Sequence, residues 1–286
     1  MLIDKDTIKL AVIGDPIDHS LSPFMHNSVF EEHGINGIYL PFRVKDSETA
    51  KFAEMAAYLD FSGFNATMPH KINLLGIVDE TDENAKNLGA INTVRIRGGK
   101  LKGYNTDADG LFRALKRRKA ELSGAGVSVL GAGGAAGAIV RGLGSQGVSY
   151  VKVINRTVSK AEELCSGLAY ADALAWTQEN LHSSALSSDI IINCTSLGMK
   201  GTDSDFSDEE LKFLDGSSAF VADLIYSPWK TKLLTYAEEL GLTVMNGLDM
   251  LIYQGLLAFE IMTDSELDTE QEFRMLYSKC KDRLKE

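Results

Sequence analysis

The sequence predicts an α/β protein of two domains, because apolar strand-like runs alternate with helical segments and the alternation occurs twice. The first series begins at residues 8–14 and the second at residues 127–130, after a polar spacer. At 286 residues the chain is long enough for two domains. We expect residues 1–107 to form the first domain, residues 108–246 to be inserted as the second, and the apolar helical stretch in 247–286 to return to the first.

The elements expected in the first series follow from apolar runs and from residues that start or stop helices. Residues 8–14 are a short apolar run ending in glycine, which is typical of a buried strand. Ser22 suits the N-cap and Pro23 the first turn of the next helix. Pro69 donates no backbone hydrogen bond and favours extended geometry before it, so the strand at 63–68 should run into a rigid turn. The other expected elements are a strand at 39–44, a helix at about 47–59 and a hairpin that begins at 90–96 and closes at Gly98-Gly99.

The second series continues the alternation. Asn105-Thr106-Asp107 precedes a helical pattern at 109–116, and an Ala-rich, helix-compatible segment follows the strand at 127–130. Strands that alternate with helices in this way predict a mostly parallel sheet. The other expected elements are strands at 151–154, 189–194, 219–224 and 242–245, and helices at about 159–168 and 230–240.

Composition argues against several classes of protein. The net charge is −11 and the isoelectric point about 5.0, which argues against a surface for nucleic acid or an anionic membrane. Any anionic ligand must then meet a local positive patch. Cys165, Cys194 and Cys280 lie far apart without a CxxC pair, which indicates reduced thiols and a cytoplasmic location. The chain has no 18-residue apolar run, and its charged start argues against a signal-peptide core. Its five histidines lack the spacing of metal ligands, so we expect no metal.

A glycine-rich segment follows the first strand of the second series. Gly131-Ala132-Gly133-Gly134-Ala135-Ala136 matches G-x-G-x-x-G/A and opens the Ala-rich segment. In this setting glycines let backbone N–H groups approach a pyrophosphate at the positive end of a helix. The alternative is a tight turn that serves packing alone, but the order strand, turn, helix favours a dinucleotide site.

The end of the next strand predicts which dinucleotide binds. Sites for NAD place Asp or Glu there to bind the ribose 2′-hydroxyl, whereas this chain has Asn155-Arg156-Thr157. A guanidinium accepts the 2′-phosphate of NADP, which a carboxylate would repel. The alternative is that Arg156 is an exposed charge ahead of a capping box formed by Ser159 and Glu162. We favour NADP.

The polar residues of the first series are each open to two interpretations. Ser20 and Ser22 share one side of an extended segment, and two hydroxyls at a helix N-terminus suit a carboxylate, but Ser22 is equally explained as an N-cap. Asn65 and Thr67 lie on one side of their strand, with Lys71 just beyond the turn. Taken singly, capping, turn formation or packing also explains Asp107, His70 and Cys194.

Taken together, these motifs resemble those of the shikimate dehydrogenase family. The order S-x-S, N-x-T-x-P-x-K, N-T-D ahead of the glycine loop is highly specific. The matching segments run along the whole chain and are G-D-P-I-D-H-S-L-S-P (14–23), N-A-T-M-P-H-K (65–71), G-A-I-N-T-V (89–94), G-Y-N-T-D (103–107), G-A-G-G-A (131–135), N-R-T (155–157) and G-L-D-M-L-I-Y-Q (247–254). The resemblance implies reversible, NADP-linked reduction of 3-dehydroshikimate to shikimate, a step towards chorismate and the aromatic amino acids.

The resemblance also implies the roles of individual residues. Lys71 and Asp107 match the catalytic pair, and Ser20 and Ser22 would bind the substrate carboxylate. The residues that would hold the ring hydroxyls are Thr67, Asn92, Asp107 and Gln254, joined by Tyr226. Those that would bind NADP are Gly131, Ala132, Gly133, Gly134, Ala135, Asn155, Arg156 and Thr157, with Leu224 and Gly247 near the nicotinamide.

Carbonyl reduction explains why this chemistry needs a lysine beside an aspartate. The carbonyl oxygen gains negative charge as hydride arrives, so it needs a proton and a nearby cation. Lys71 supplies both from the turn fixed by Pro69, and Asp107 would orient its ammonium group. Which of the two is the base in the oxidation direction stays open, because a close pair titrates as a unit.

The fold class that follows is two α/β domains with a cleft between them. Residues 1–107 plus 247–286 would form the substrate-binding domain, and residues 108–246 a Rossmann-like NADP-binding domain. The cleft is expected at the carboxyl ends of the strands, where ligands bind in open α/β sheets.

Three departures from the family pattern leave the catalytic positions intact: Ala66 for Val, Ala108 for Gly, and Asn246-Gly247 for Asp-Gly. Some family members are quinate/shikimate dehydrogenases that use NAD; Arg156 argues against NAD, whereas quinate stays open as a substrate.

A non-catalytic, NADP-sensing regulator on the same scaffold is the alternative of another class, but it would not need Lys71 and Asp107. The sequence leaves the oligomeric state open, a homodimer included.

Overall fold

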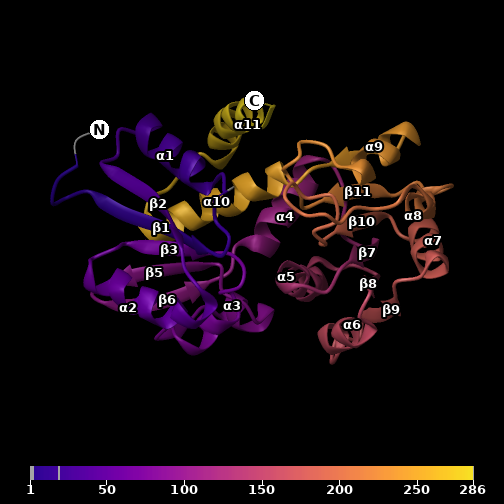
Figure 1. Ribbon diagram of the computed structural model, residues 1–286, viewed down its shortest axis with the longest axis horizontal. Coiled ribbons are helices and arrows are strands. Elements are labelled where there is room, and N and C mark those ends of the chain that lie inside the picture. The colour runs from indigo at the N-terminus through magenta and orange to yellow at the C-terminus, as the bar shows by residue number, and fades with distance from the viewer. Residues whose placement is uncertain (1–2, 19, 286) are drawn as a thin grey trace. The chain divides into compact units, whose positions relative to one another are not determined.

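The computed structural model describes residues 3–18 and 20–285 (Figure 1). The chain divides into two compact units, Met1–Gly110 with Ile252–Cys280, and Leu111–Leu251 with Lys281–Glu286. The divisions fall inside two long helices, α4 (Asp107–Arg117) and α10 (Leu248–Thr263), whose first residues are the predicted domain boundaries or lie next to them.

The assignment of the C-terminus differs from the expectation that all of residues 247–286 return to the first domain. Residues 247–251 and 281–285 belong to the second unit, and residues 108–110 to the first. One contact agrees with the placement of Lys281, whose ammonium lies 5.6 Å from the centre of the Trp229 ring, in a cation–π arrangement within the second unit.

The first unit contains a six-stranded mixed sheet in the order β2-β1-β3-β5-β6-β4. Strand β1 is parallel to β2 and β3, and β5 is antiparallel to β3 and β6. The expected hairpin is therefore confirmed, and it closes through Gly98 and Gly99 at φ values of +56° and +75°. The strands are β1 (Ile8–Gly14), β2 (Gly37–Arg43), β3 (Gly63–Ala66), β4 (Glu80–Thr81), β5 (Thr93–Arg97) and β6 (Lys100–Tyr104).

Helices cover both faces of this sheet (Figure 1). On one face Ala53 of α2 and Ala85 of α3 pack with Ile13 and Phe64 in a buried apolar cluster. On the other face the His26 ring of α1 stacks on Tyr39 of β2 and on Phe259 of α10. The helices are α1 (Ser22–Glu32), α2 (Thr49–Tyr58), α3 (Glu83–Leu88) and α11 (Thr269–Lys285), with short 3-10 helices η1 (Asp46–Glu48) and η2 (Asn73–Gly76).

The second unit contains a six-stranded sheet in which all the strands are parallel, in the order β12-β11-β10-β7-β8-β9. Numbered by appearance within the unit, the order reads 6-5-4-1-2-3, which is the doubly wound arrangement of dinucleotide-binding folds. The chain reverses direction across the sheet between β7 and β10, the topological switch point. The strands are β7 (Gly126–Leu130), β8 (Tyr150–Asn155), β9 (Ala171–Ala175), β10 (Ile190–Asn193), β11 (Phe220–Asp223) and β12 (Val244–Met245).

The helices of the second unit confirm the predicted α/β class. Leu181 of α7 and Leu233 of α9 pack with Leu130, Ile154 and Val221 of the strands in one apolar cluster. The helices are α5 (Gly134–Leu143), α6 (Val158–Cys165), α7 (Gln178–Ser187), α8 (Asp208–Leu211) and α9 (Lys232–Glu239), with η3 (Gly144–Gln146) and η4 (Lys212–Leu214). The sequence did not predict β9 or α7. Strand β9 lies at the edge of the sheet, and its sequence has no periodic run of buried residues.

One predicted helix cap is wrong, and a second cap that was considered only as an alternative is absent. Helix α1 begins at Ser22 itself, so Leu21 occupies the N-cap and makes no side-chain cap; the Ser20 hydroxyl instead accepts a bond from the Ser22 N–H at 3.3 Å. The capping box of Ser159 and Glu162, which belonged to the alternative interpretation of Arg156, is absent, since Thr157 is the N-cap of α6 and Ser159 lies inside the helix. In both cases the helix starts earlier than the capping residue suggested.

Candidate functional site

The turn at residues 67–71 is held in place by backbone bonds to two neighbouring strands. Strand β3 ends at Ala66, two residues before the expected end, and the Thr67 N–H then donates to Ile13 O of β1 at 2.9 Å. The Met68 carbonyl accepts from the Asp15 N–H at 3.1 Å, which joins the turn to the loop after β1. Because β1 and β3 are parallel neighbours, these two loops leave the same edge of the sheet.

The far end of this turn is equally fixed. The Lys71 carbonyl accepts from Ile91 N at 2.8 Å, just before β5. The adjacent His70 is fully buried, and its Nδ1 lies 2.7 Å from Thr49 Oγ1. Burial lowers the pKa of His70, which agrees with the interpretation of this histidine as a turn and core residue. The backbone therefore presents the Lys71 side chain from a rigid support.

The structure brings Lys71 and Asp107 into direct contact. Lys71 Nζ lies 2.5 Å from Asp107 Oδ2, and the two side chains are only 16% and 7% exposed. Asp107 is the first residue of α4, where its N–H donates to Asn105 Oδ1 at 3.0 Å. The Asn105 side chain thus bonds the first N–H of the helix, while the Asp107 carboxylate contacts the lysine.

Asn92 holds the other oxygen of this carboxylate. Its Nδ2 donates to Asp107 Oδ1 at 2.8 Å and to Thr106 Oγ1 at 2.9 Å. Thr106 Oγ1 lies 3.5 Å from Gln254 Oε1, so α10 contributes to the same cluster. Sequence analysis assigned no role to Thr106, although its position inside the N-T-D motif was a signal.

The remaining predicted residues of the first unit, apart from Gln254, lie after the parallel neighbours β1 and β3. Thr67 follows β3, and its methyl group would lie 2.5 Å from a Cβ placed on Gly14, so only glycine fits at the end of β1. Ser20 lies in the loop after β1 and Ser22 opens α1, with both residues half-buried.

In the second unit the glycine-rich loop has the predicted shape. Gly131 follows β7 directly with φ +103°, and Gly133 is the N-cap of α5. A Cβ added at Gly133 or Gly134 would meet nothing within 4 Å, so packing against the protein does not explain these two glycines. The half-buried Ala132 and Ala135 complete the loop. Open space at the N-terminus of a helix suits a pyrophosphate, so this segment fits a dinucleotide.

Arg156 follows β8 and is exposed, as a ligand for a phosphate must be. Its guanidinium lies over the Trp176 ring at 5.7 Å, and Trp176 follows the neighbouring strand β9. The Asn155 side chain donates to Thr157 O at 2.8 Å, which shapes the turn, and Thr157 makes no capping bond with its side chain. Trp176 was not identified from the sequence, since β9 itself was not predicted.

The structure also brings Leu224 and Gly247 together. Leu224 follows β11, and Gly247 N donates to Ile225 O at 3.0 Å. A Cβ added at Gly247 would lie 2.0 Å from Leu224 O, so the backbones approach too closely for any other residue. Tyr226 is half-buried in the same loop.

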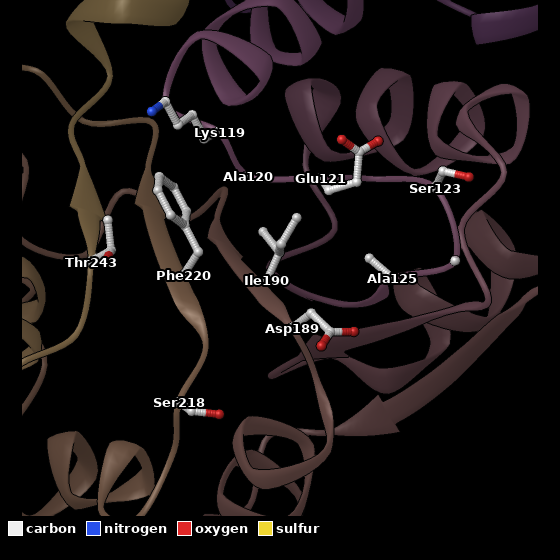
Figure 2. A pocket seen from close by; sticks show the side chains of 11 residues that line it. Lys119, Ala120, Glu121, Ser123, Ala125, Asp189, Ile190, Ser218, Phe220 and Thr243 are labelled. Carbon is white, nitrogen blue, oxygen red and sulfur yellow. The ribbon is translucent and has the colours of Figure 1, made fainter.

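A separate depression of about 440 Å³ opens at the opposite edge of the second sheet (Figure 2). It lies at the amino ends of β7, β10, β11 and β12, where Ala125, Ile190, Phe220 and Thr243 line it. Ligands of open α/β sheets bind at the carboxyl ends. None of the predicted site residues lines this depression, so we do not assign the active site to it.

Cys194, directly after β10, is a half-buried thiol rather than a reactive one. Cys165 and Cys194 are free thiols. Burial and the Asp223 carboxylate raise the pKa of Cys194 well above its ordinary value, which disfavours a thiolate nucleophile. Within residues 3–18 and 20–285 no cluster of three metal-ligating side chains occurs, and no helix there is long and apolar enough to cross a bilayer.

Fold and site together define a class of protein. A doubly wound parallel sheet with a glycine-rich turn after its first strand is typical of dinucleotide-dependent oxidoreductases, and the other unit carries a lysine–aspartate pair suited to carbonyl chemistry. The chain matches the family models for the shikimate dehydrogenase substrate-binding domain (residues 12–94), shikimate/quinate 5-dehydrogenase (113–203) and the shikimate 5′-dehydrogenase C-terminal domain (247–271). This protein belongs to the shikimate dehydrogenase family.

Individual relatives agree with this assignment along almost the whole chain. Shikimate dehydrogenase (NADP(+)) of Alkaliphilus metalliredigens is 36% identical over 281 residues, which cover 94% of this chain and 96% of the relative. Shikimate 5-dehydrogenase of Listeria monocytogenes, solved with shikimate and NAD, superposes with a TM-score of 0.83 at 34% identity, covering 96% and 98% of the two chains. The ligand-free structure of 5-ketofructose reductase of a Gluconobacter strain superposes with a TM-score of 0.79 at 30% identity. The superposition covers 96% of this chain and 99% of the reductase.

Proposed function

We propose that this protein catalyses the reversible, NADP-linked reduction of 3-dehydroshikimate to shikimate, a step towards chorismate and the aromatic amino acids. The observation that carries the proposal is the contact of 2.5 Å between Lys71 and Asp107, with Asn92 on the second carboxylate oxygen. A cytoplasmic location stays a prediction based on the reduced cysteines.

The ion pair suits general acid catalysis at a carbonyl. When bound, the nicotinamide supplies the hydride in reduction and takes it in oxidation. Lys71 has three N–H donors, and Asp107 occupies one of them, so others remain for the substrate oxygen. In reduction the ammonium would stabilise the charge developing on that oxygen and transfer a proton to it. Asp107 would hold the ammonium in position throughout.

The other predicted residues would bind and orient the substrate. Ser20 and Ser22 would bind its carboxylate, because they lie where the loop after β1 leads into α1. The groups proposed for the ring hydroxyls are Thr67, Asn92, Asp107, Tyr226 and Gln254. These side chains include both donors and acceptors of hydrogen bonds, as a polyhydroxylated ring requires.

The second unit would hold the cofactor. Residues 131–135 would bind the pyrophosphate, because Gly133 and Gly134 leave space at the N-terminus of α5. Asn155, Arg156 and Thr157 would surround the 2′-phosphate, with Arg156 as its charged partner. Leu224 and Gly247, whose backbones lie in contact, would flank the nicotinamide.

A matrix of substrates and cofactors tests the proposal. Pure protein is mixed with shikimate or quinate and with NADP or NAD, and NADPH or NADH absorbance is followed. We expect the largest kcat/KM with shikimate and NADP. Because a structural relative is a 5-ketofructose reductase, 5-ketofructose with NADPH is a third substrate arm. If neither shikimate nor quinate supports NADP reduction while NADP still binds, the protein is a sensor or acts on another substrate, and the proposal is wrong.

A further inference from the structure

A chain of buried hydrogen bonds leads from Tyr39 to the carboxylate of Asp107. The Tyr39 hydroxyl donates to Asn65 Oδ1 at 2.7 Å, and Asn65 Nδ2 donates to Thr93 Oγ1 at 3.0 Å. Thr93 Oγ1 in turn donates to Asn92 Oδ1 at 2.8 Å, and Asn92 Nδ2 donates to Asp107 Oδ1 at 2.8 Å. All five residues are buried. The chain thus ends on the ion pair, although its first three members have no role in the proposed function.

Backbone groups fix the direction of every bond in the chain. The Thr106 N–H can only donate, and it donates to Asn92 Oδ1 at 2.9 Å, so the Asn92 NH2 group must turn toward Asp107. The Asn92 carbonyl can only accept, and it accepts Asn65 Nδ2 at 3.2 Å. The Thr93 oxygen receives the second N–H of Asn65, which leaves its own proton for Asn92 Oδ1. Each side chain therefore orients the next.

The start of the chain is anchored as firmly as its end. Asn27 of α1 bonds both the N–H and the carbonyl of Tyr39, each at 2.9 Å. The Tyr39 ring stacks on His26 with centroids 4.1 Å apart and planes 1° from parallel. Burial raises the pKa of Tyr39 well above its ordinary value and lowers the pKa of His26 to about 3, so the phenol stays a neutral donor beside a neutral ring.

The sheet explains how distant residues form one chain. Tyr39 lies on β2 and Asn65 on β3, with β1 between them, so the phenol reaches across one strand. Asn65 and Thr93 are direct partners in the antiparallel register of β3 and β5, so their side chains emerge on the same face. A network in which every hydrogen-bonding group has a partner is rigid. Removal of one partner leaves a buried polar group unpaired, which costs free energy of desolvation.

We propose that Tyr39, Asn65 and Thr93 are positioning residues that hold the Asn92 amide against Asp107 and thereby set the position of the Lys71–Asp107 pair. The inference rests on the proposed function. None of the three needs to touch the reacting atoms, because each acts through the next side chain. Loss of one link weakens or removes the bond from Thr93 to Asn92 Oδ1, so the Thr106 N–H becomes the main support of this oxygen and the amide can shift away from the carboxylate.

A double-mutant cycle tests whether the chain acts through Lys71. Thr93→Val removes the hydroxyl at nearly constant shape, and Tyr39→Phe removes the first donor. Each change should lower kcat about 3- to 10-fold, the usual effect of one hydrogen bond. In a Lys71→Ala background, measured at high enzyme concentration, each should cost less than about 2-fold, because there is no longer an ammonium to position. Equal factors in both backgrounds would show a merely structural role and overturn the inference.

Two controls separate positioning from general loss of packing. Thr93→Ser restores the hydroxyl and should recover kcat to within about 2-fold of wild type. Thr7→Val removes another buried threonine hydroxyl of the same unit, bonded to Asp4 and Asn36, and should leave kcat unchanged. All rates are normalised to folded protein, and KM for NADP should stay constant throughout.

A crystal structure of Thr93→Val gives a readout that does not depend on activity. The expected result is an Asn92 amide that keeps its bond from the Thr106 N–H but is displaced, with a distance to Asp107 Oδ1 that exceeds about 3.5 Å. An unchanged bond would refute the inference even if the variant were slow. If the wild-type protein had no dehydrogenase activity, the proposed function would be refuted. The crystal structure of Thr93→Val would still decide whether Thr93 positions the amide.

Discussion

At the scale of single residues, the short contact between Lys71 and Asp107 is the feature on which the proposed chemistry depends. Both side chains are mostly removed from solvent, and the lysine stands on a turn held by backbone bonds at both ends. A preorganised ammonium of this kind costs little reorganisation during the reaction. The pair is therefore a better marker of function than the overall fold, which hosts more than one activity.

Replacing Lys71 should affect turnover more than substrate binding. General acid catalysis contributes on the order of 10²–10⁴-fold, so Lys71→Ala should lower kcat by a factor in that range. Steady-state kinetics with shikimate and NADP checks the expectation, with the exposed Lys86→Ala as the control that should behave like wild type. A variant that kept its kcat and changed only KM would make Lys71 a binding residue.

Arg156 determines the expected choice between NADP and NAD. A charge-assisted hydrogen bond contributes about 1.5–3 kcal/mol, so Arg156→Ala should lower the preference for NADP roughly 10- to 150-fold. The ratio of kcat/KM for the two cofactors is the quantity to measure, because any loss common to both cancels in it. Lys160→Ala, which removes an exposed cation of the nearby helix α6, should leave the ratio unchanged. An unchanged ratio in Arg156→Ala would show that the phosphate is held elsewhere.

At the scale of elements, one buried carboxylate organises the loop after β11. Asp223 Oδ1 accepts from Asn193 of β10 at 2.9 Å and from the Ile225 N–H at 3.0 Å, while Oδ2 accepts from Thr231, the N-cap of α9, at 2.7 Å. The loop that carries Leu224 and Tyr226 is thus tied to a strand and to a helix. Burial nevertheless dominates these bonds and raises the pKa of Asp223 from 3.8 to about 6.

This raised pKa makes stability depend on pH. The folded protein binds the proton more tightly than the unfolded chain, so the contribution of Asp223 is greatest below pH 4 and is lost as the pH rises through about 6. At 1.36 kcal/mol per pH unit, the loss is about 3 kcal/mol. Asp223→Asn has no carboxylate to ionise and should lack this pH-dependent loss. Between pH 4 and pH 7 its free energy of unfolding should therefore rise by about 3 kcal/mol relative to that of wild type.

Urea unfolding of wild type and variant at both pH values measures the difference. The exposed Asp203→Asn serves as the control, since removal of a solvated carboxylate should leave the difference between the two pH values as in wild type. If the difference in free energy of unfolding between wild type and Asp223→Asn were the same at both pH values, the expectation would be contradicted.

The elements also show where sequence patterns suffice and where they do not. The hairpin at Gly98-Gly99 and the turn at Gly131 were predictable, because steric limits on φ act within a few residues. Strand β9 was missed, because at the edge of a sheet its burial depends on neighbours that the local sequence does not reveal. The mistaken N-cap at Ser22 has a similar cause, since a helix start is decided by packing as well as by the capping residue.

At the scale of the whole molecule, the division of labour between the two units is a testable proposal. Amide hydrogen exchange of the full chain, measured by mass spectrometry, should show protection by NADP concentrated in residues 126–135 and 150–158. Shikimate should protect residues 63–71 and 91–107. The physical reason is that a bound ligand suppresses local opening of the segments that hold it. Protection of the first two segments by shikimate alone would contradict the assignment.

The sequence by itself determined the alternation of strands and helices and the place of the glycine loop, because both arise from local periodicity and backbone sterics. The polar motifs were recognised through their resemblance to a family, which implied the pairing of Lys71 with Asp107. The contacts through which these and the other polar groups meet are seen only in the tertiary structure. Lys71 and Asp107 are 36 positions apart, and Tyr39 and Asn65 are 26 apart, with a strand of the sheet between them. A hydrogen bond requires its atoms to lie within about 3 Å in a fixed direction, and for residues so far apart along the chain only the folded sheet and its covering helices impose that geometry.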